Sequence, residues 1–178
     1  MGRRRRVPSR SFNLLLLGTA FLAILILSGP ARPQEAIPSV IKLNYHASES
    51  EFQPGAEMQL LEMLTRARQH YGLQPLVMDP SLRFVARVHS RDMAINGYVG
   101  HDSLLGESFL NRLAGVVRGG TYVGENVTIA QTPEQAQTSF VASRLHLKNM
   151  LEPAFHRVGI GIATAGPLGL VITEDFSE

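Results

Sequence analysis

Three ionisable residues on separate stretches of the chain, His101, Glu125 and His146, have side chains that could form one small site. His101 ends the stretch "NGYVGH", where two glycines follow a predicted helix end and allow the imidazole to point inward. Glu125 precedes the β-branched run "NVTIA", where a carboxylate costs stability unless another group uses it. His146 lies where a predicted helix gives way to a turn. The three side chains are candidates for one cleft.

Two chemistries are open to such a cleft. Two neutral imidazoles, His101 and His146, bind a divalent cation such as zinc and leave a coordination position open, with Glu125 as a ligand or base. Alternatively, a Glu–His pair performs acid–base chemistry without metal, because each group shifts the pKa of the other. A third interpretation makes these groups structural hydrogen-bonding partners. No His-Glu-x-x-His, Gly-x-Ser-x-Gly or phosphate-binding glycine loop decides among them.

Two further histidines are interpreted as structural. His89 lies on an apolar helical stripe with Ala86 and Met93, which is typical of a packed core histidine. His156 follows Phe155 just before a predicted strand, and we expect it at the surface.

Two long helices are predicted before His101. Residues 56–72 place Leu60, Leu64, Ala67 and Tyr71 on one face and end at a glycine. Residues 79–97 begin with an Asp-Pro cap and also end at a glycine. Three arginines of the second helix are expected to face water: Arg83, Arg87 and Arg91.

The remaining elements are shorter. A helix is predicted over 106–115 and another over 131–143, where Thr132 and Gln135 form a capping box. Alternating apolar residues in "RVGIGIATAGPLGLVITEDF" predict an antiparallel hairpin, and "YVGENVTIA" predicts a third strand, with Gly124 allowing the turn into it. Helices first and strands late favour an α+β fold.

The N-terminus has the layout of an export signal. Five arginines precede the apolar run "LLLLGTAFLAILILSG", and prolines follow it. We expect residues 1–31 to be a signal peptide cleaved after Ala31 or a retained anchor at 14–29. Residues 32–55 are expected to be a linker, with a short strand at "VIKLNYH", and 56–178 the folded domain.

Composition limits the functions further. Without the five signal arginines, the chain has 12 basic and 15 acidic residues, so its charge gives no support to nucleic-acid binding. The chain has no cysteine, which excludes disulfides and thiolate metal sites. Any membrane contact is expected through the N-terminal segment alone.

Four motifs in order resemble the CAP superfamily of cysteine-rich secretory, antigen 5 and pathogenesis-related 1 proteins, also called SCP-like extracellular domains. They are the helical stretch ending in "GYVGHDS", the signature "GENV", the segment "SFVASRLHLKNMLEPAFHRVGIGIA" and the terminal "TEDF". Together they span about residues 56 to 177. The resemblance implies an α-β-α sandwich with a central cleft lined by His101, Glu125 and His146, and with Asn126 and Gly124 in structural roles.

The resemblance also implies a set of functions. Some relatives bind a divalent cation such as zinc at the cleft histidines, others bind sterols or fatty acids, and proteolysis has been proposed for a few. The sequence departs from the family at Phe140, which replaces a frequent Trp, and at Arg144-Leu145, which replace Pro-Gly. No acid lies between Glu134 and Glu152, so the second cleft glutamate of animal and plant members is missing.

We therefore expect a secreted, periplasmic or cell-surface CAP domain that is non-enzymatic and binds a cation or small ligand. The alternatives are a metal-dependent hydrolase or peptidase, with His101 and His146 holding the metal and Glu125 as base, and a lipid- or sterol-binding module. The expected partner is a small molecule, a lipid or an envelope component.

Overall fold

A five-stranded sheet forms the centre of the molecule. The computed structural model describes residues 22–25, 40–118 and 121–178. The strand order is β1-β5-β7-β6-β3, and every neighbouring pair is antiparallel except β3 with β6. The strands are β1 (Leu22–Leu25), β3 (Val77–Met78), β5 (Val123–Ala130), β6 (Arg157–Thr164) and β7 (Leu170–Ser177). A smaller antiparallel pair joins β2 (Val40–Lys42) to β4 (Tyr98–Gly100).

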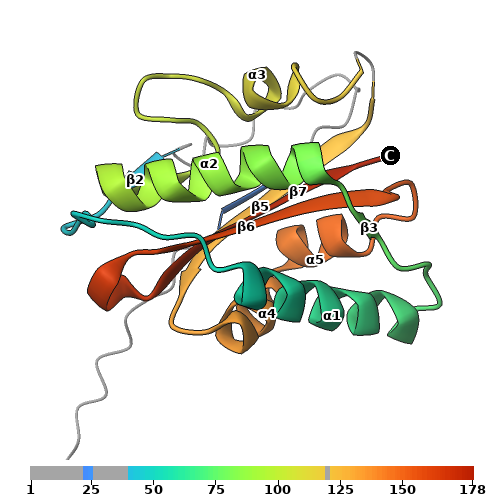
Figure 1. Cartoon of the computed structure of the whole chain (residues 1–178). Coiled ribbons are helices and arrows are strands. Elements are labelled where there is room, and N and C mark those ends of the chain that lie inside the picture. The colour runs from blue at the N-terminus through green and yellow to red at the C-terminus, as the bar shows by residue number, and fades with distance from the viewer. Residues whose placement is uncertain (1–21, 26–39, 119–120) are drawn as a thin grey trace, which may run out of the picture.

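Helices cover both faces of the sheet, as Figure 1 shows. On one face lie α2 (Pro80–Asn96) and α3 (Phe109–Leu113). On the other face lie α1 (Pro54–His70), α4 (Pro133–Ala142) and α5 (Arg144–Met150). The result is the α-β-α sandwich that the family resemblance implies, with the antiparallel strands between the helical layers.

The close packing of α2 on β6 depends on two glycines. A Cβ atom added to Gly159 would lie 2.1 Å from the backbone of Leu82, and one added to Gly161 would lie 2.2 Å from the backbone of Ala86. Only a residue without a side chain fits there, so the "GIG" of the predicted hairpin sets the distance between helix and sheet. The hairpin itself is confirmed, with β6 and β7 paired along their whole lengths.

The second helix begins and ends as predicted. The carboxylate of Asp79 accepts hydrogen bonds from the backbone N–H groups of Ser81 and Leu82, and Gly97 ends the helix with φ of 66°. Its inward stripe includes His89, which is 1% exposed and therefore is the packed histidine that the sequence indicates.

Two of the three arginines expected to face water are instead partly buried against a carboxylate of the neighbouring helix. Glu57 of α1 is fully buried, and the guanidinium groups of Arg83 and Arg87 both donate hydrogen bonds to its carboxylate. The backbone N–H of Ile162 donates to the same carboxylate at 3.3 Å. The prediction for these arginines was wrong because helical periodicity shows which face a residue occupies but not which charge the neighbouring helix presents there.

Three other local expectations differ from the structure. Tyr71 is 58% exposed and caps α1 instead of lying on its buried face. Helix α5 was not anticipated, because the chain bends at Ser143 and then resumes helical geometry. Residues 40–53, assigned to the linker, contain the predicted short strand as β2, and they also form the bridge from Phe52 to Ala163, so the folded region begins before residue 56.

Most of the predicted N-terminal signal or anchor lies outside the described residues. The exception is residues 22–25, which form β1. In the three described ranges, no helix is long and apolar enough to cross a membrane.

Candidate functional site

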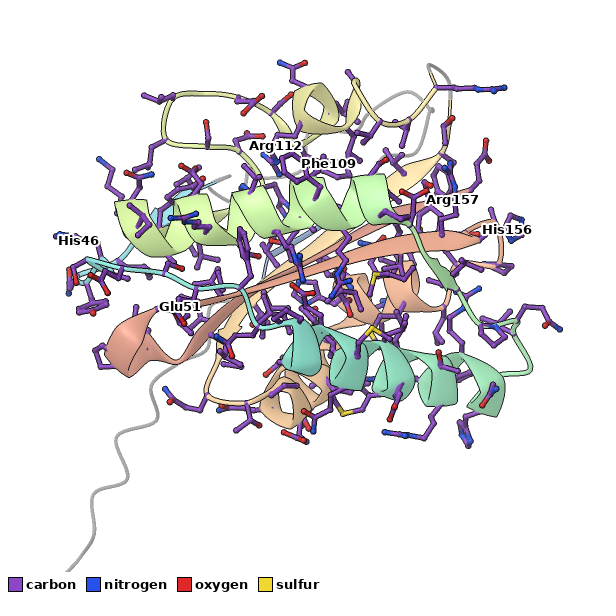
Figure 2. The ribbon with its side chains drawn as sticks, in the orientation of Figure 1. His46, Glu51, Phe109, Arg112, His156 and Arg157 are labelled. Carbon is purple, nitrogen blue, oxygen red and sulfur yellow. The ribbon has the colours of Figure 1, made fainter. Side chains whose placement is uncertain are left out.

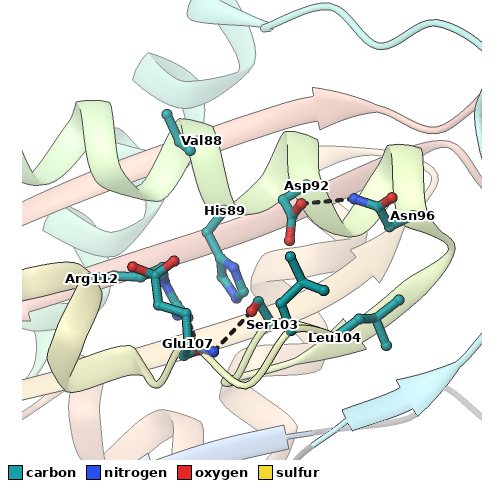
Figure 3. Close-up of a pocket in the computed structure, with 9 residues that line it drawn as sticks. Val88, His89, Asp92, Asn96, Ser103, Leu104, Glu107 and Arg112 are labelled. Carbon is teal, nitrogen blue, oxygen red and sulfur yellow. Dashed lines mark hydrogen bonds between the residues drawn. The ribbon is translucent and has the colours of Figure 1, made fainter.

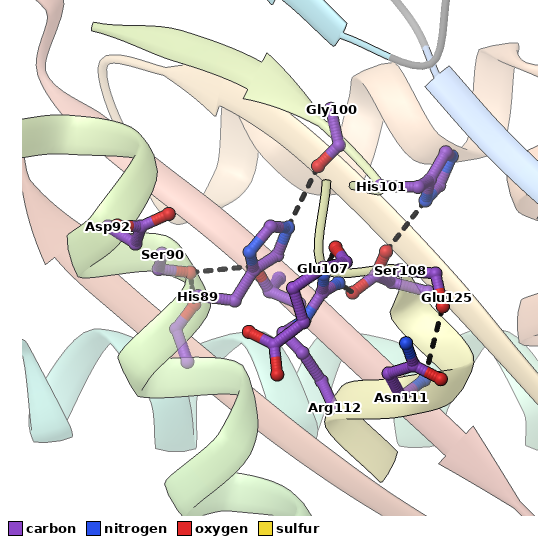
Figure 4. Close-up of polar contacts among 12 residues, drawn as sticks. His89, Ser90, Asp92, Gly100, His101, Glu107, Ser108, Asn111, Arg112 and Glu125 are labelled. Atoms are coloured by element: carbon purple, nitrogen blue, oxygen red, sulfur yellow. Dashed lines mark hydrogen bonds and ion pairs between the residues drawn. The ribbon is translucent and has the colours of Figure 1, made fainter. Parts of the chain in front are cut away.

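His101 and Glu125 lie in direct contact. His101 follows β4, and Glu125 is the third residue of β5. The His101 Nδ1 atom lies 2.7 Å from Glu125 Oε1, and both side chains are fully buried, as Figure 4 shows. The structure therefore brings together two of the three candidate residues, from strands separated by a short helix and loop.

Arg112 completes this contact from the other side. Its Nη2 atom donates to Glu125 Oε2 at 2.7 Å, and only 7% of its side chain is exposed. Arg112 belongs to α3, which begins at the N-cap Ser108. In Figure 2 it projects beside Phe109 on the same helix, far from the surface residues His156 and Arg157. His156 is exposed at the start of β6, as predicted.

Sequence reasoning missed Arg112. Its signal was present, because it is the only Lys or Arg between His101 and Val117. A single cation on a short apolar helix, close in sequence to a glutamate within a strand, is a candidate partner for that glutamate.

A second carboxyl group adjoins Glu125 from the neighbouring strand. Asp175 of β7 is the register partner of Glu125 and is fully buried. Burial raises the pKa of Asp175 well above its usual range, and the Glu125 carboxylate raises it further. Burial also raises the pKa of Glu125 to about 7, although Arg112 opposes that shift. The pair therefore carries less negative charge near neutral pH than two ordinary carboxylates.

His146 is fully buried like the other two candidate residues. Its backbone carbonyl accepts a hydrogen bond from Asn126 Nδ2 at 3.3 Å, and its ring packs edge-on against Phe140 with the ring centroids 5.1 Å apart. The structure thus places the backbone of His146 beside the residue that follows Glu125 in β5.

Asn126 is the centre of an amide network on that side. It donates to Glu174 Oε2 at 3.0 Å, and it accepts from Asn149 Nδ2 at 2.9 Å. Asn149 also donates to the backbone carbonyl of Glu125 at 3.1 Å. Gly124 lies within β5 and has no positive φ, so it does not serve the expected turn. A Cβ atom there would lie 3.1 Å from both Asn149 and Phe155, so a glycine lets these side chains approach the strand.

A pocket of about 410 Å³ opens between α2 and the loop after His101, as Figure 3 shows. Arg112 forms part of its wall and so links it to Glu125. Its other polar lining residues are His89, Asp92, Asn96, Ser103 and Glu107.

Two residues of the pocket, His89 and Asp92, form hydrogen bonds within the protein. His89 lies 2.8 Å from the backbone carbonyl of Gly100 through Nε2. Burial, reinforced by the charge of Arg112, lowers the pKa of His89 to about 3, so the ring is neutral near pH 7 and donates this bond. Asp92 accepts hydrogen bonds from Asn96 at 2.7 Å and from the hydroxyl of Tyr98.

Glu125 does not fit the role of a metal ligand. His101 and Arg112 engage its two oxygens, and the guanidinium group places a positive charge where a cation would bind. Among the described residues, no group of three or more His, Cys, Asp or Glu could hold a metal ion, whereas catalytic zinc sites use three protein ligands. A cation held by His101 and His146 stays a prediction.

A family model and a bacterial relative both match this sequence. The model of the cysteine-rich secretory protein family, CAP, matches residues 61–176. The uncharacterized protein YkwD of Bacillus subtilis is 32% identical over 113 residues, which are 63% of this chain and 44% of YkwD. The chain therefore spans less than half the length of that relative.

Solved structures show the same fold. An extracellular protein containing an SCP domain from Bacillus anthracis matches with a TM-score of 0.62 at 27% identity, over 70% of this chain and 40% of that chain. An outer surface protein from Borrelia burgdorferi matches with a TM-score of 0.64 at 12% identity, over 73% and 98% of the two chains. With the family match covering well over half of its residues, the chain belongs to the cysteine-rich secretory protein (CAP) family, among its bacterial members.

Proposed function

We propose that this chain is an exported CAP domain with a non-enzymatic binding site. Its ligand is a small molecule that combines an amine or another hydrogen-bond donor with an apolar part. The ligand occupies the pocket between α2 and the loop after His101.

The engagement of Glu125 on both oxygens carries this proposal. A general base must present a lone pair to the proton that it removes. Glu125 is fully buried and already accepts from Arg112, with His101 on its other oxygen. Such a network holds the loop after β4, helix α3 and β5 in fixed positions. This rigidity supports a preorganised wall for binding and argues against Glu125 as the base of a hydrolase.

The pocket lining defines the class of ligand. Two acidic residues, Asp92 and Glu107, line it, while the cation Arg112 is already paired with Glu125. The lining therefore favours a donor or a positive group over an anion. Val88, Leu104 and Leu105 supply apolar surface at the same pocket, which suits a ligand with an apolar part.

Export is supported by two observations. The N-terminus carries arginines, an apolar run and prolines in the order of a secretory signal. Two structural relatives are described as an extracellular protein and an outer surface protein.

The test compares two probes by NMR titration of the full chain, ethanolamine as the amine and acetate as the anion. Ethanolamine is expected to shift the resonances of the pocket residues, and Asp92→Asn is expected to weaken its binding by about tenfold, roughly the value of one charge-assisted hydrogen bond. Glu62→Gln on the exposed side of α1 is the matched control and is expected to leave binding unchanged. Tighter binding of acetate than of ethanolamine would contradict the proposal.

A zinc titration of the same samples distinguishes a metal site from the amine-binding site proposed above. Stoichiometric zinc binding that is lost in both His101→Ala and His146→Ala would replace the amine-binding proposal with a metal site. Binding of ethanolamine without zinc supports the proposal as stated.

Lipid binding is the second candidate, because large apolar side chains surround the pocket. Leu105 is 99% exposed, and Phe84 and Val88 expose 67% and 46% along α2. Exposed apolar side chains in such a group are typical of binding surfaces. Mass spectrometry of organic extracts, from protein purified without detergent, is expected to show a co-purified lipid that is lost in Val88→Ser/Leu105→Ser if this candidate is correct.

A further inference from the structure

The outer edge of β5 has an occupant from the same chain. One edge of β5 pairs with β7, and the other pairs antiparallel with β1. Without β1, this edge would present a row of unpaired backbone N–H and C=O groups, which is a template for another strand. The edge runs beside the candidate site, because Glu125 and Asn126 lie in the paired part of β5.

Strand β1 pairs with the part of β5 that carries Glu125. Ile24 of β1 is the register partner of Glu125, and Leu22 is the register partner of Val127. Helix α5, which carries His146, packs against both β1 and β5. The strand, blue in Figure 1, lies along the edge of β5, close to the fully buried side chain of Glu125.

We propose that the outer edge of β5, flanked by α5, is an acceptor site for an extended apolar peptide strand, and that residues 22–25 of the chain itself are its occupant. Backbone hydrogen bonds to β5 supply the affinity, as in strand addition to other sheet edges. The sequence of the strand, Leu-Ala-Ile-Leu, is entirely apolar, which suits a strand against which α5 packs.

This occupancy makes the site dependent on the N-terminal segment. Residues 22–25 belong to the apolar run 14–29, which the sequence predicts to be a signal or anchor. The same four residues cannot pair with β5 while they lie in a membrane or after they are cleaved away. The domain therefore has a closed form with the strand in place and an open form in which the β5 edge and the residues behind it are exposed. The proposal does not depend on which ligand the pocket takes.

Disulfide trapping tests the proposal in the full chain, because the sequence contains no cysteine. Leu22→Cys with Val127→Cys joins two register partners, and partners on antiparallel strands have the Cα separation that a disulfide requires. Leu25→Cys with Val127→Cys is the matched control, because its positions are three residues out of register and about 10 Å apart. Both variants are oxidised under the same conditions and analysed by mass and by non-reducing electrophoresis.

The expected result is a disulfide within one chain in the first variant and none in the control. Disulfide-linked dimers in the first variant would overturn the proposal, because a second copy would then supply the strand. Equal crosslinking of both pairs, or no crosslinking of the first, would also overturn it.

Hydrogen exchange gives an independent measurement. Ile24→Pro removes a backbone N–H donor and disfavours strand pairing, whereas Ile24→Val keeps the donor and permits the pairing. Exchange of the β5 amides is expected to be at least about tenfold faster in the proline variant than in the valine variant, while the hairpin of β6 and β7 keeps its protection. Identical β5 exchange in the two variants would show that residues 22–25 do not occupy this edge.

Discussion

Two adjacent residues of β5, Glu125 and Asn126, lie on opposite faces of the sheet and contact different kinds of groups. Glu125 points toward α3, where it meets the imidazole of His101 and the guanidinium group of Arg112. Asn126, one residue later, points toward α5 and meets amides and carbonyls. Successive side chains of a strand alternate between faces, so the single dipeptide "EN" serves both. One face carries a charge network beside a pocket, and the other carries an amide network that joins β5 to β7 and α5.

Each face also contains a buried carboxyl group, and its negative charge is unfavourable there unless a neighbouring group compensates it. Burial raises the pKa of Glu125 to about 7 against the opposing effect of Arg112, and burial raises that of Glu174 to about 7 against a hydrogen bond from Asn126. The cause is the same on both faces, but the neutralising groups differ. A full positive charge compensates one carboxylate, whereas the other relies on an amide and on holding its proton.

The largest effect is expected from Arg112→Ala. It leaves Glu125 buried without its cation, and breaking a buried ion pair by removing one partner costs about 3–5 kcal/mol. The free energy of unfolding, measured by urea titration, is expected to fall by that amount. Arg66→Ala removes an exposed ion pair with Glu62 and is expected to cost less than about 0.5 kcal/mol.

A double variant sharpens this result. Arg112→Ala/Glu125→Gln removes both charges, so its stability is expected to lie above that of Arg112→Ala alone. If the double variant is less stable by the sum of the two single effects, the two side chains are not energetically coupled and the charge network is not what holds this face together.

The sequence predicted the layers of the fold better than it predicted the contacts at the site. The helices around residues 56–72 and 79–97 and the C-terminal hairpin follow from local periodicity and capping, and the structure contains all of them. Local patterns do not reveal which elements meet. The ion pair of Arg112 with Glu125 depends on how a five-residue helix docks, which no periodicity over five residues can specify.

The position of His146 illustrates the same limit. Helix α5 begins immediately after α4 ends, with Ser143 serving as both the last cap and the next N-cap. Because the bend at one serine redirects the following seven residues, the backbone of His146 meets Asn126 on the amide side. That His101 and Glu125 share a cleft, by contrast, is a prediction that the sequence supports, because both are ionisable residues placed directly after glycines.

The next largest effect is expected from Asn126→Ala on the amide face. It removes the donor to Glu174 and the acceptor of Asn149, so buried polar groups lose their partners. The expected loss is about 2–3 kcal/mol in the free energy of unfolding, below that of Arg112→Ala, because no full charge is left uncompensated. Asn111→Ala on the exposed side of α3 is the matched control, expected within about 0.5 kcal/mol of the parent. A larger loss than for Arg112→Ala would reverse the contrast between the faces.

The smallest effect, a pH-dependent one, is expected from Glu174→Gln. Because the folded pKa of Glu174 is raised from 4.5 to about 7, the folded state binds more protons than the unfolded state in this window, and this group lowers stability as pH rises. Glutamine resembles the protonated acid, so the variant is expected to match the parent near pH 5 and to be more stable by on the order of 2 kcal/mol near pH 8. Urea titrations at the two pH values measure the difference.

Glu125→Gln, the equivalent change on the charged face, is expected to behave differently. The folded pKa of Glu125 is also raised, to about 7, so the parent carries a protonated Glu125 near pH 5 and glutamine is expected to leave stability nearly unchanged there. Near pH 8 the amide removes the anion that Arg112 binds, so the gain in stability is expected to be smaller than for Glu174→Gln. The same substitution is thus expected to stabilise the protein more on the amide face than on the charged face at pH 8. If both variants showed the pH profile of Glu174→Gln, Arg112 would not be compensating Glu125, and the two faces would differ only in their hydrogen-bonding partners.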